Sequence, residues 1–202
     1  MATIINASNS VSSLQLTGDT SGILQLQSSG VTQQTIDSTG SYGQIKSSTA
    51  VASTSGTSID FTSIPSWVKR ITVMFNGVST NGTSRKLIQL GSTTFTTTGY
   101  ISTSAFFDTA TGFSVIQFTT GFGIQSTQAV DALYGSFTIS LLNSSTNTWA
   151  LSGNAAGTSA SVAMIVSGGG VSLSGVLDRV RITTVNGTDT FDAGSINILY
   201  EG

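Results

Sequence analysis

Arg70-Ile71-Thr72-Val73-Met74-Phe75 is the clearest structural signal in this 202-residue chain. Ile71, Val73 and Phe75 recur at every second position. Because successive side chains of a β-strand point to opposite faces, this period of two predicts a strand with one buried face.

Eight further segments have strand-like composition, and Gly, Asn and Asp residues separate them at intervals of roughly ten residues, as in β-sandwich domains. No stretch has the 3.6-residue periodicity of an amphipathic helix. We therefore expect an all-β chain whose main domain is an antiparallel β-sandwich of the jelly-roll kind. The additional predicted strands span residues 86–90, 100–106, 113–119, 132–142, 148–151, 161–166, 179–185 and 195–200.

Short motifs predict how these strands are connected. Asn76-Gly77 and Asn81-Gly82 are typical of hairpin turns. Pro65 predicts the end of one element before the strand at residue 70, because proline has no N–H to donate to a central strand. Gly168-Gly169-Gly170 lacks the Lys-Ser/Thr and the helix of a phosphate-binding loop, which indicates a flexible connection between strands. The glycines of Gly121-Phe122-Gly123 indicate a bulge or a close approach between strands.

Residues 1–45 predict a short N-terminal β-hairpin region that is distinct from the domain at residues 46–202. Leu14-Gln15-Leu16 returns ten residues later as Leu24-Gln25-Leu26, with Gly and Asp residues between them, which predicts a hairpin. A third short segment follows at residues 31–36. Such polar strands cannot enclose a core alone, so we expect them to pair with other subunits or with a larger assembly. Residues 46–56 read as a linker or a weak edge strand.

The composition argues against most enzyme chemistry. The chain has no histidine and no cysteine, whereas 66 of its residues are Ser or Thr. Without imidazole or thiolate there is no Ser-His-Asp triad and no ordinary zinc, haem or iron–sulfur site, so we expect no metal and no cofactor. The net charge of −2 offers no basic stripe for nucleic acid. We expect a binding or structural protein that is not an enzyme.

The start of the chain predicts synthesis and folding in a cytosol. Residues 1–8 lack the positive region and the apolar run of a secretory signal. No segment approaches the roughly 18 consecutive apolar residues of a membrane helix.

Carboxylates are the remaining candidates for catalysis, because glycoside hydrolysis needs only two acids about 5–10 Å apart. Asp189 and Asp192 are the closest pair in the sequence. The residues before Asp189, Asn-Gly-Thr, are typical of a turn, where Asp is expected for its local hydrogen bonds. Asp178 lies next to Arg179 and close to Arg181, which predicts a surface ion pair.

Aromatic residues are better candidates for ligand contact. Tyr100, Tyr134 and Trp149 each have an apolar face that can lie against a sugar ring and a polar edge that can form hydrogen bonds. The alternative is that they belong to the core, as aromatic residues in half-buried strands usually do. Phe106 and Phe107 are adjacent, so they point to opposite sides of a strand, and one of them is expected to meet a second surface such as a neighbouring subunit.

Three stretches of the sequence resemble the fibre and appendage proteins of tailed bacteriophages. The stretch at residues 1–8, continued by Gly18-Asp19-Thr20-Ser21-Gly22 to Gln27, resembles their N-terminal segments. Residues 61–79, which contain Ile64-Pro65-Ser66-Trp67-Val68, resemble a segment of their distal domains, and residues 189–201 resemble their closing strand. The resemblance implies a homotrimeric virion protein with an N-terminal attachment part and a β-rich tip that meets the host surface. The chain lacks an extended shaft and coiled-coil heptads, which points to a short tail fibre or a head fibre.

The expected function is therefore that of a phage fibre protein, made in the host cytoplasm and carried on the tail or capsid surface of the virion. It would bind host-surface glycan through residues 46–202 and contact itself and another virion protein through residues 1–45. A capsid decoration or head-fibre protein with a mainly structural role is the alternative, and a polysaccharide depolymerase is a third hypothesis. The residues expected to serve virion attachment and oligomerisation are Ile4, Ile5, Leu14, Leu16, Leu24 and Leu26.

Overall fold

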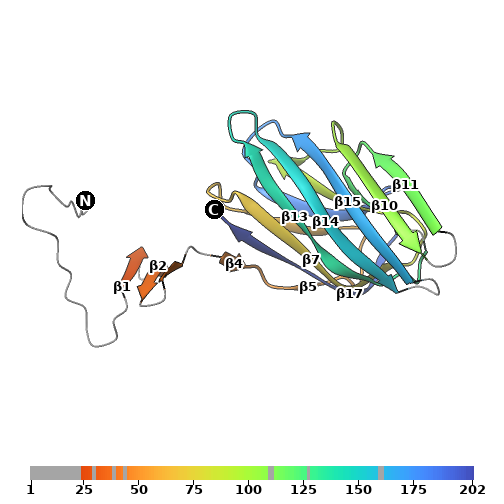
Figure 1. The fold of residues 1–202 in the computed structure, drawn as a ribbon, viewed down its shortest axis with the longest axis horizontal. Coiled ribbons are helices and arrows are strands. Elements are labelled where there is room, and N and C mark those ends of the chain that lie inside the picture. Colours follow the sequence, from red (N-terminus) through yellow and green to blue (C-terminus); the bar gives the residue numbers. More distant parts are fainter. Residues whose placement is uncertain are drawn as a thin grey trace, which may run out of the picture. The chain divides into compact units, whose positions relative to one another are not determined.

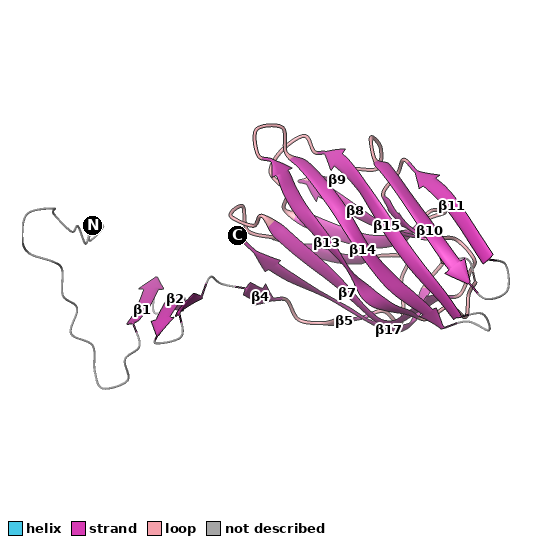
Figure 2. Cartoon of the chain, viewed as in Figure 1, coloured by secondary structure: helices cyan, strands magenta, loops and turns pink. Residues whose placement is uncertain are grey.

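A computed structural model describes residues 24–28, 31–37, 40–42, 45–108, 112–126, 128–158 and 162–202. Within these residues all regular structure is β-strand in antiparallel sheets, which confirms the predicted all-β class (Figures 1 and 2). No helix of the described residues is long and apolar enough to cross a membrane. The chain separates into two compact units, residues 1–44 and 45–202.

The first unit contains a three-stranded antiparallel sheet in the order β1-β2-β3. Leu24 and Leu26 lie on β1 and pair with Ile36 and Gln34 of β2. The described hairpin therefore joins the second leucine segment to the third predicted segment, whereas Ile4, Ile5, Leu14 and Leu16 lie outside the described residues. The strands are β1 (Leu24–Ser28), β2 (Val31–Asp37) and β3 (Gly40–Tyr42).

The second unit is a β-sandwich whose larger sheet has the strand order β11-β10-β15-β14-β13-β7-β17-β4, with β5 also paired to β17. Figure 1 shows β13, β14, β15, β10 and β11 side by side in one layer. The strands of this sheet are β4 (Ile45–Ser47), β5 (Val51–Ala52), β7 (Arg70–Thr80), β10 (Ile101–Asp108), β11 (Gly112–Phe118), β13 (Leu133–Asn143), β14 (Thr148–Thr158), β15 (Val162–Ser172) and β17 (Phe191–Glu201).

The smaller sheet has the order β12-β8-β16-β6, and the short β9 pairs with β8. β6 and β12 were not among the predicted strands, because four and three residues are too few to display a clear alternation. The strands are β6 (Ile59–Thr62), β8 (Lys86–Ser92), β9 (Thr94–Phe95), β12 (Phe122–Ile124) and β16 (Arg179–Thr184).

The hydrophobic core lies between the two sheets. Ile71, Val73 and Phe75 of β7 are all buried, which confirms the alternation that predicted this strand. Ile88 of β8 and Val180 of β16 are buried in the same cluster from the smaller sheet. Each fully buried aliphatic side chain of this kind stabilises the fold by about 1.5–3 kcal/mol.

The Asn76-Gly77 pair is not a hairpin turn, as the sequence predicted, but lies inside β7. Gly77 has a φ of 68° and falls at a break in the register between β7 and β13. A bulge and a turn both use a residue with positive φ, so the local sequence does not distinguish them. Asn81 and Gly82 do lie in the loop between β7 and β8, but these strands belong to different sheets, so this loop is not a hairpin turn either.

The triple glycine at residues 168–170 is not a connection between strands either, because it lies inside β15. Close packing accounts for the glycine at position 169, since a Cβ atom there would lie 2.5 Å from the carbonyl oxygen of Ile101. Gly123 is similarly crowded, because its Cβ would lie 2.0 Å from a ring carbon of Phe118, which confirms the predicted close approach. Pro65 lies between β6 and β7, where it was predicted to separate two elements.

Candidate functional site

Two of the three aromatic residues predicted to contact ligand are part of the core. Tyr100 and Trp149 are each only 2% exposed. The Tyr100 hydroxyl accepts a hydrogen bond from the backbone N–H of Leu90 at 2.7 Å, and its ring packs edge-on against Phe122 with the centroids 5.0 Å apart. We therefore do not retain Tyr100 and Trp149 as contact residues, because burial between the sheets removes them from any surface ligand.

Tyr134, the third candidate, lies at the surface. Its side chain is 46% exposed on the side of β13 that faces away from the core. Its hydroxyl lies close to Gly77, where an added Cβ atom would be 3.0 Å away.

A groove of about 460 Å³ lies over the face of the smaller sheet that is turned away from the core. Gln89 of β8 and Arg181 and Thr183 of β16 line it, in alternation with core residues such as Ile88. Hydroxyl groups dominate the remaining lining, which includes Thr57, Ser58, Thr97, Thr120 and Thr184. The groove therefore offers many groups that both donate and accept hydrogen bonds, and one cation.

The guanidinium of Arg181 is held in a fixed orientation. It donates two hydrogen bonds, of 2.8 and 2.7 Å, to the carboxylate of Asp60 on β6, and it lies 4.0 Å from the ring centroid of Phe95. The hydrogen bonds that Arg181 donates to Asp60 raise the pKa of Arg181 above its ordinary value. A guanidinium that is both paired and stacked loses little further freedom when it contacts a ligand.

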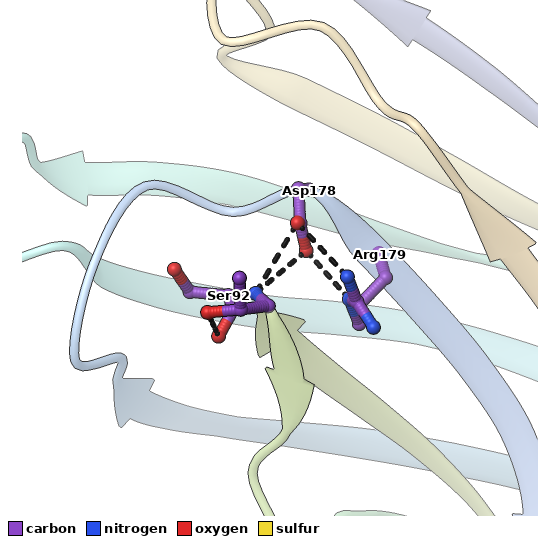
Figure 3. A network of polar contacts seen from close by, with 4 residues as sticks. Ser92, Asp178 and Arg179 are labelled. Atoms are coloured by element: carbon purple, nitrogen blue, oxygen red, sulfur yellow. Dashed lines mark hydrogen bonds and ion pairs between the residues drawn. The ribbon is translucent and has the colours of Figure 1, made fainter.

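A second ion pair lies next to this one on the same sheet. Arg179 donates hydrogen bonds of 2.7 and 3.1 Å to Asp178, which confirms the surface ion pair that the sequence predicted for Asp178. The same carboxylate accepts hydrogen bonds from the backbone N–H of Thr93, and Figure 3 shows it between Arg179 and the chain beside Ser92. These hydrogen bonds, that of Arg179 first, lower the pKa of Asp178 below its ordinary value.

A smaller groove of about 260 Å³ is lined by Asp60, Tyr200 and residues of the segment that contains β5. The Asp60–Arg181 pair thus contributes one residue to each groove. Trp67 is 39% exposed, and its ring centroid lies 5.8 Å from that of Tyr200. The amine of Lys46 lies 5.7 Å from the Trp67 ring. An exposed aromatic surface therefore adjoins the smaller groove.

The carboxylates that were considered for glycoside hydrolysis form structural hydrogen bonds. Asp189 accepts hydrogen bonds from the side-chain amide of Asn186 at 2.6 Å and from the backbone N–H of Ser84 at 2.9 Å. The bond from Asn186 is the main reason that the pKa of Asp189 lies below its ordinary value. Asp192 accepts a hydrogen bond from the hydroxyl of Ser79. Within the described part of the chain no three acidic residues gather in a way that could hold a metal ion.

Lys86 is a buried amine that the sequence did not single out. It is 1% exposed, and its Nζ donates a hydrogen bond of 3.4 Å to the hydroxyl of Ser126. That hydroxyl donates in turn to the carboxylate of Asp131 at 3.3 Å. Burial lowers the pKa of Lys86 to about 8, although the negative charge of Asp131 opposes the effect.

Sequence reasoning missed Phe95, Trp67 and the position of Arg181 in the wall of the larger groove. The alternation Arg179-Val180-Arg181-Ile182 does place both arginines on one strand face, and this signal was present in the sequence. The partner of Arg181, Asp60, lies 121 residues away in the chain, which no local pattern predicts.

No protein-family model, curated protein or solved structure matches this chain. The structure itself shows a β-sandwich protein whose larger groove is polar and lined mainly by hydroxyl groups.

Proposed function

We propose that this chain is a virion fibre protein of a tailed bacteriophage, that it forms homotrimers, and that it binds a host-surface glycan through residues 46–202. The N-terminal region, residues 1–45, would attach it to another virion protein. The observation that carries the glycan part of the proposal is the hydroxyl-lined groove around Arg181.

The chemistry of this groove suits a carbohydrate. A sugar offers hydroxyl groups that donate and accept, and the groove presents Thr and Ser hydroxyls together with the amide of Gln89. The Gln89 amide is oriented by a hydrogen bond of 2.8 Å to the carbonyl oxygen of Thr120. The groove volume of about 460 Å³ lies within the usual range of small-molecule sites.

The fixed cation favours a particular kind of glycan. Arg181 already shares its charge with Asp60, and its exposed edge remains on the groove wall. A neutral or weakly acidic sugar can accept from this edge without displacing the carboxylate. Low affinity at each site is sufficient, because three sites on one trimer act together through a high effective concentration.

The test measures binding of the purified full-length protein to extracted surface polysaccharides and to arrayed glycans. Arg181→Met is expected to weaken binding at least about tenfold, because a charge-assisted hydrogen bond is lost. Arg179→Met is the matched control, since Arg179 is also paired with aspartate and adjoins Phe95 but does not line the groove.

Equal loss of binding in both variants, or no glycan binding by the wild-type protein, would contradict the glycan proposal. Many copies per virion together with no glycan binding would favour the mainly structural role of a capsid decoration protein.

A further inference from the structure

A row of apolar side chains crosses the face of the larger sheet that is turned away from the core. In strand register, Phe113 of β11 lies opposite Phe107 of β10, and Phe107 lies opposite Met164 of β15. The row continues through Ala156 of β14 to Tyr134 of β13. The rings of Phe107 and Phe113 are in contact, with centroids 5.1 Å apart.

A second row lies beside the first. Val115 of β11 is opposite Ala105 of β10, which is opposite Val166 of β15. We name the large side chains of both rows the outer apolar patch. All are at least 46% exposed, and Phe113 is 61% exposed. The outer apolar patch consists of Phe107, Phe113, Val115, Tyr134, Met164 and Val166.

The strands that carry this patch have almost no charge. Within the bounds of β10, β11, β13, β14 and β15, Asp108 is the single charged residue. Surfaces that remain in water usually carry interspersed charges, and edge strands such as β11 are usually protected by Lys or Pro. β11 is the outermost strand of this sheet among the described strands and contains neither. This face therefore has the composition of a surface that another protein covers.

Two glycines leave a shallow area next to the patch. Cβ atoms added to Gly168 and Gly170 of β15 would meet only a backbone oxygen, at 3.7 and 3.5 Å. Internal packing therefore does not require glycine at either position, unlike Gly169 between them. Glycine weakens a strand interior, and it often marks a place where another backbone approaches closely.

We infer that the outer apolar patch is the surface through which copies of this chain assemble, with the phenylalanines of one copy packed over the glycines of another. The inference deepens the oligomeric part of the proposed function by assigning the subunit interface to this face. Phe107 is then the member of the Phe106–Phe107 pair that meets a second surface, while Phe106 packs against the core.

A further copy fits this face because the face is complementary to itself. It contains a ridge, Phe107 on β10 and Phe113 on β11, and a shallow area, Gly168 and Gly170 on the adjoining strand β15. Neither the ridge nor the shallow area carries a charge. A partner with charged groups at this face would therefore lose the hydration of those groups without gaining an ion pair.

The area of the outer apolar patch is also large enough to form the centre of a subunit interface. Six side chains exposed to this extent provide roughly 500–600 Å² of apolar surface, and the small residues between them bring the contact toward the roughly 800 Å² per partner of a stable interface. Contact between a ridge and a separate shallow area can close as a dimer or as a trimer.

The experiment measures the mass of the full-length protein by sedimentation over a dilution series. The wild-type protein is expected to be oligomeric, and Phe107→Ser with Phe113→Ser is expected to raise its dissociation constant at least about tenfold. Gly168→Val with Gly170→Val should weaken assembly as well, because it fills the shallow area. Val176→Ser is the control, since Val176 is exposed outside the patch. Thermal unfolding confirms that each variant is folded.

A monomeric wild-type protein, or variants that assemble as tightly as the wild type, would overturn the inference. Hydrogen exchange gives an independent readout, because amides of β10 and β11 should become more protected as the protein concentration rises. Glycan binding is measured on the same variants. If the substitutions dissociate the oligomer but the wild-type protein binds no glycan, this inference is supported and the glycan proposal is refuted. The proposed homotrimer requires the mass of the wild-type oligomer to be that of three chains.

Discussion

The hydroxyl oxygen of Ser104 lies 3.1 Å from the backbone nitrogen of Gln125 and accepts a hydrogen bond from it across the sandwich. Ser104 is on β10 of the larger sheet, and Gln125 follows β12 at the edge of the smaller one. Ser102 accepts a hydrogen bond from Gly123 in the same way, at 3.1 Å. Two buried serines thus accept hydrogen bonds from backbone N–H groups within and directly after β12, which pairs with β8 and forms an edge of the smaller sheet among the described strands.

Ser104→Ala is expected to destabilise the protein by about 1–3 kcal/mol, because the buried N–H of Gln125 loses its acceptor. The hydroxyl of Ser167 also donates to Ser104 at 2.9 Å and would lose that partner. Denaturant unfolding measures the effect. Ser152→Ala, at an exposed position of β14, is the control and should change the free energy of unfolding by less than about 0.5 kcal/mol. An equally small effect at Ser104 would contradict this role.

Stability should increase with pH above neutrality because of Lys86. Burial lowers its pKa to about 8 in the folded protein, against an ordinary value of 10.5 in the unfolded chain. At a pH between these two pKa values the unfolded chain binds more protons than the folded protein does. The free energy of unfolding should therefore rise by about 2 kcal/mol from pH 7.5 to pH 10. Burial of Tyr100 raises its pKa, which opposes any further increase above pH 10.

Lys86→Met should remove most of this pH dependence, whereas Lys69→Met, at an exposed lysine, should leave it unchanged. Unfolding curves at several pH values provide the comparison. If the wild-type curve were flat over this range, the Lys86 amine would have to remain charged in the folded protein.

Gly194→Ala should be much more damaging than Gly99→Ala. Both glycines have positive φ, of 88° and 80°, so both variants carry the strain of roughly 1–2 kcal/mol that an L-residue experiences there. A Cβ atom at Gly194 would also lie 2.3 Å from the backbone oxygen of Gly77, whereas one at Gly99 meets nothing within 4 Å. Thermal unfolding of the two variants separates backbone strain from steric conflict, and equal losses would show that β17 can move away from β7.

Asp178→Asn should have only a small effect on stability. The carboxylate binds Arg179 and the N–H of Thr93, but the pair is partly exposed and surface ion pairs contribute at most about 1 kcal/mol. Because the folded-state pKa of Asp178 is lowered, its contribution is present above the ordinary pKa of the carboxyl and is lost as the pH falls through the lowered value. Unfolding at pH 7 and at pH 3 should therefore show a larger difference between wild type and variant at pH 7.

The sequence alone was sufficient for the fold class and for most strands, because alternation along a strand is a local property that burial of one face imposes. It was less informative where glycine and alanine replace large apolar residues. β14 and β15 extend to Thr158 and Ser172, well beyond the predicted segments, because pairing with neighbouring strands compensates for weak local preference.

Which face each aromatic residue occupies was decided only by the tertiary structure. Tyr100 and Trp149 are buried and Tyr134 is exposed, although the three looked equivalent in the sequence. Arg181 meets Asp60, and Phe107 meets Met164, only because antiparallel pairing brings distant strands into one register. Local sequence determines that a strand forms, whereas contacts between remote strands determine which of its faces is covered and what its exposed residues meet.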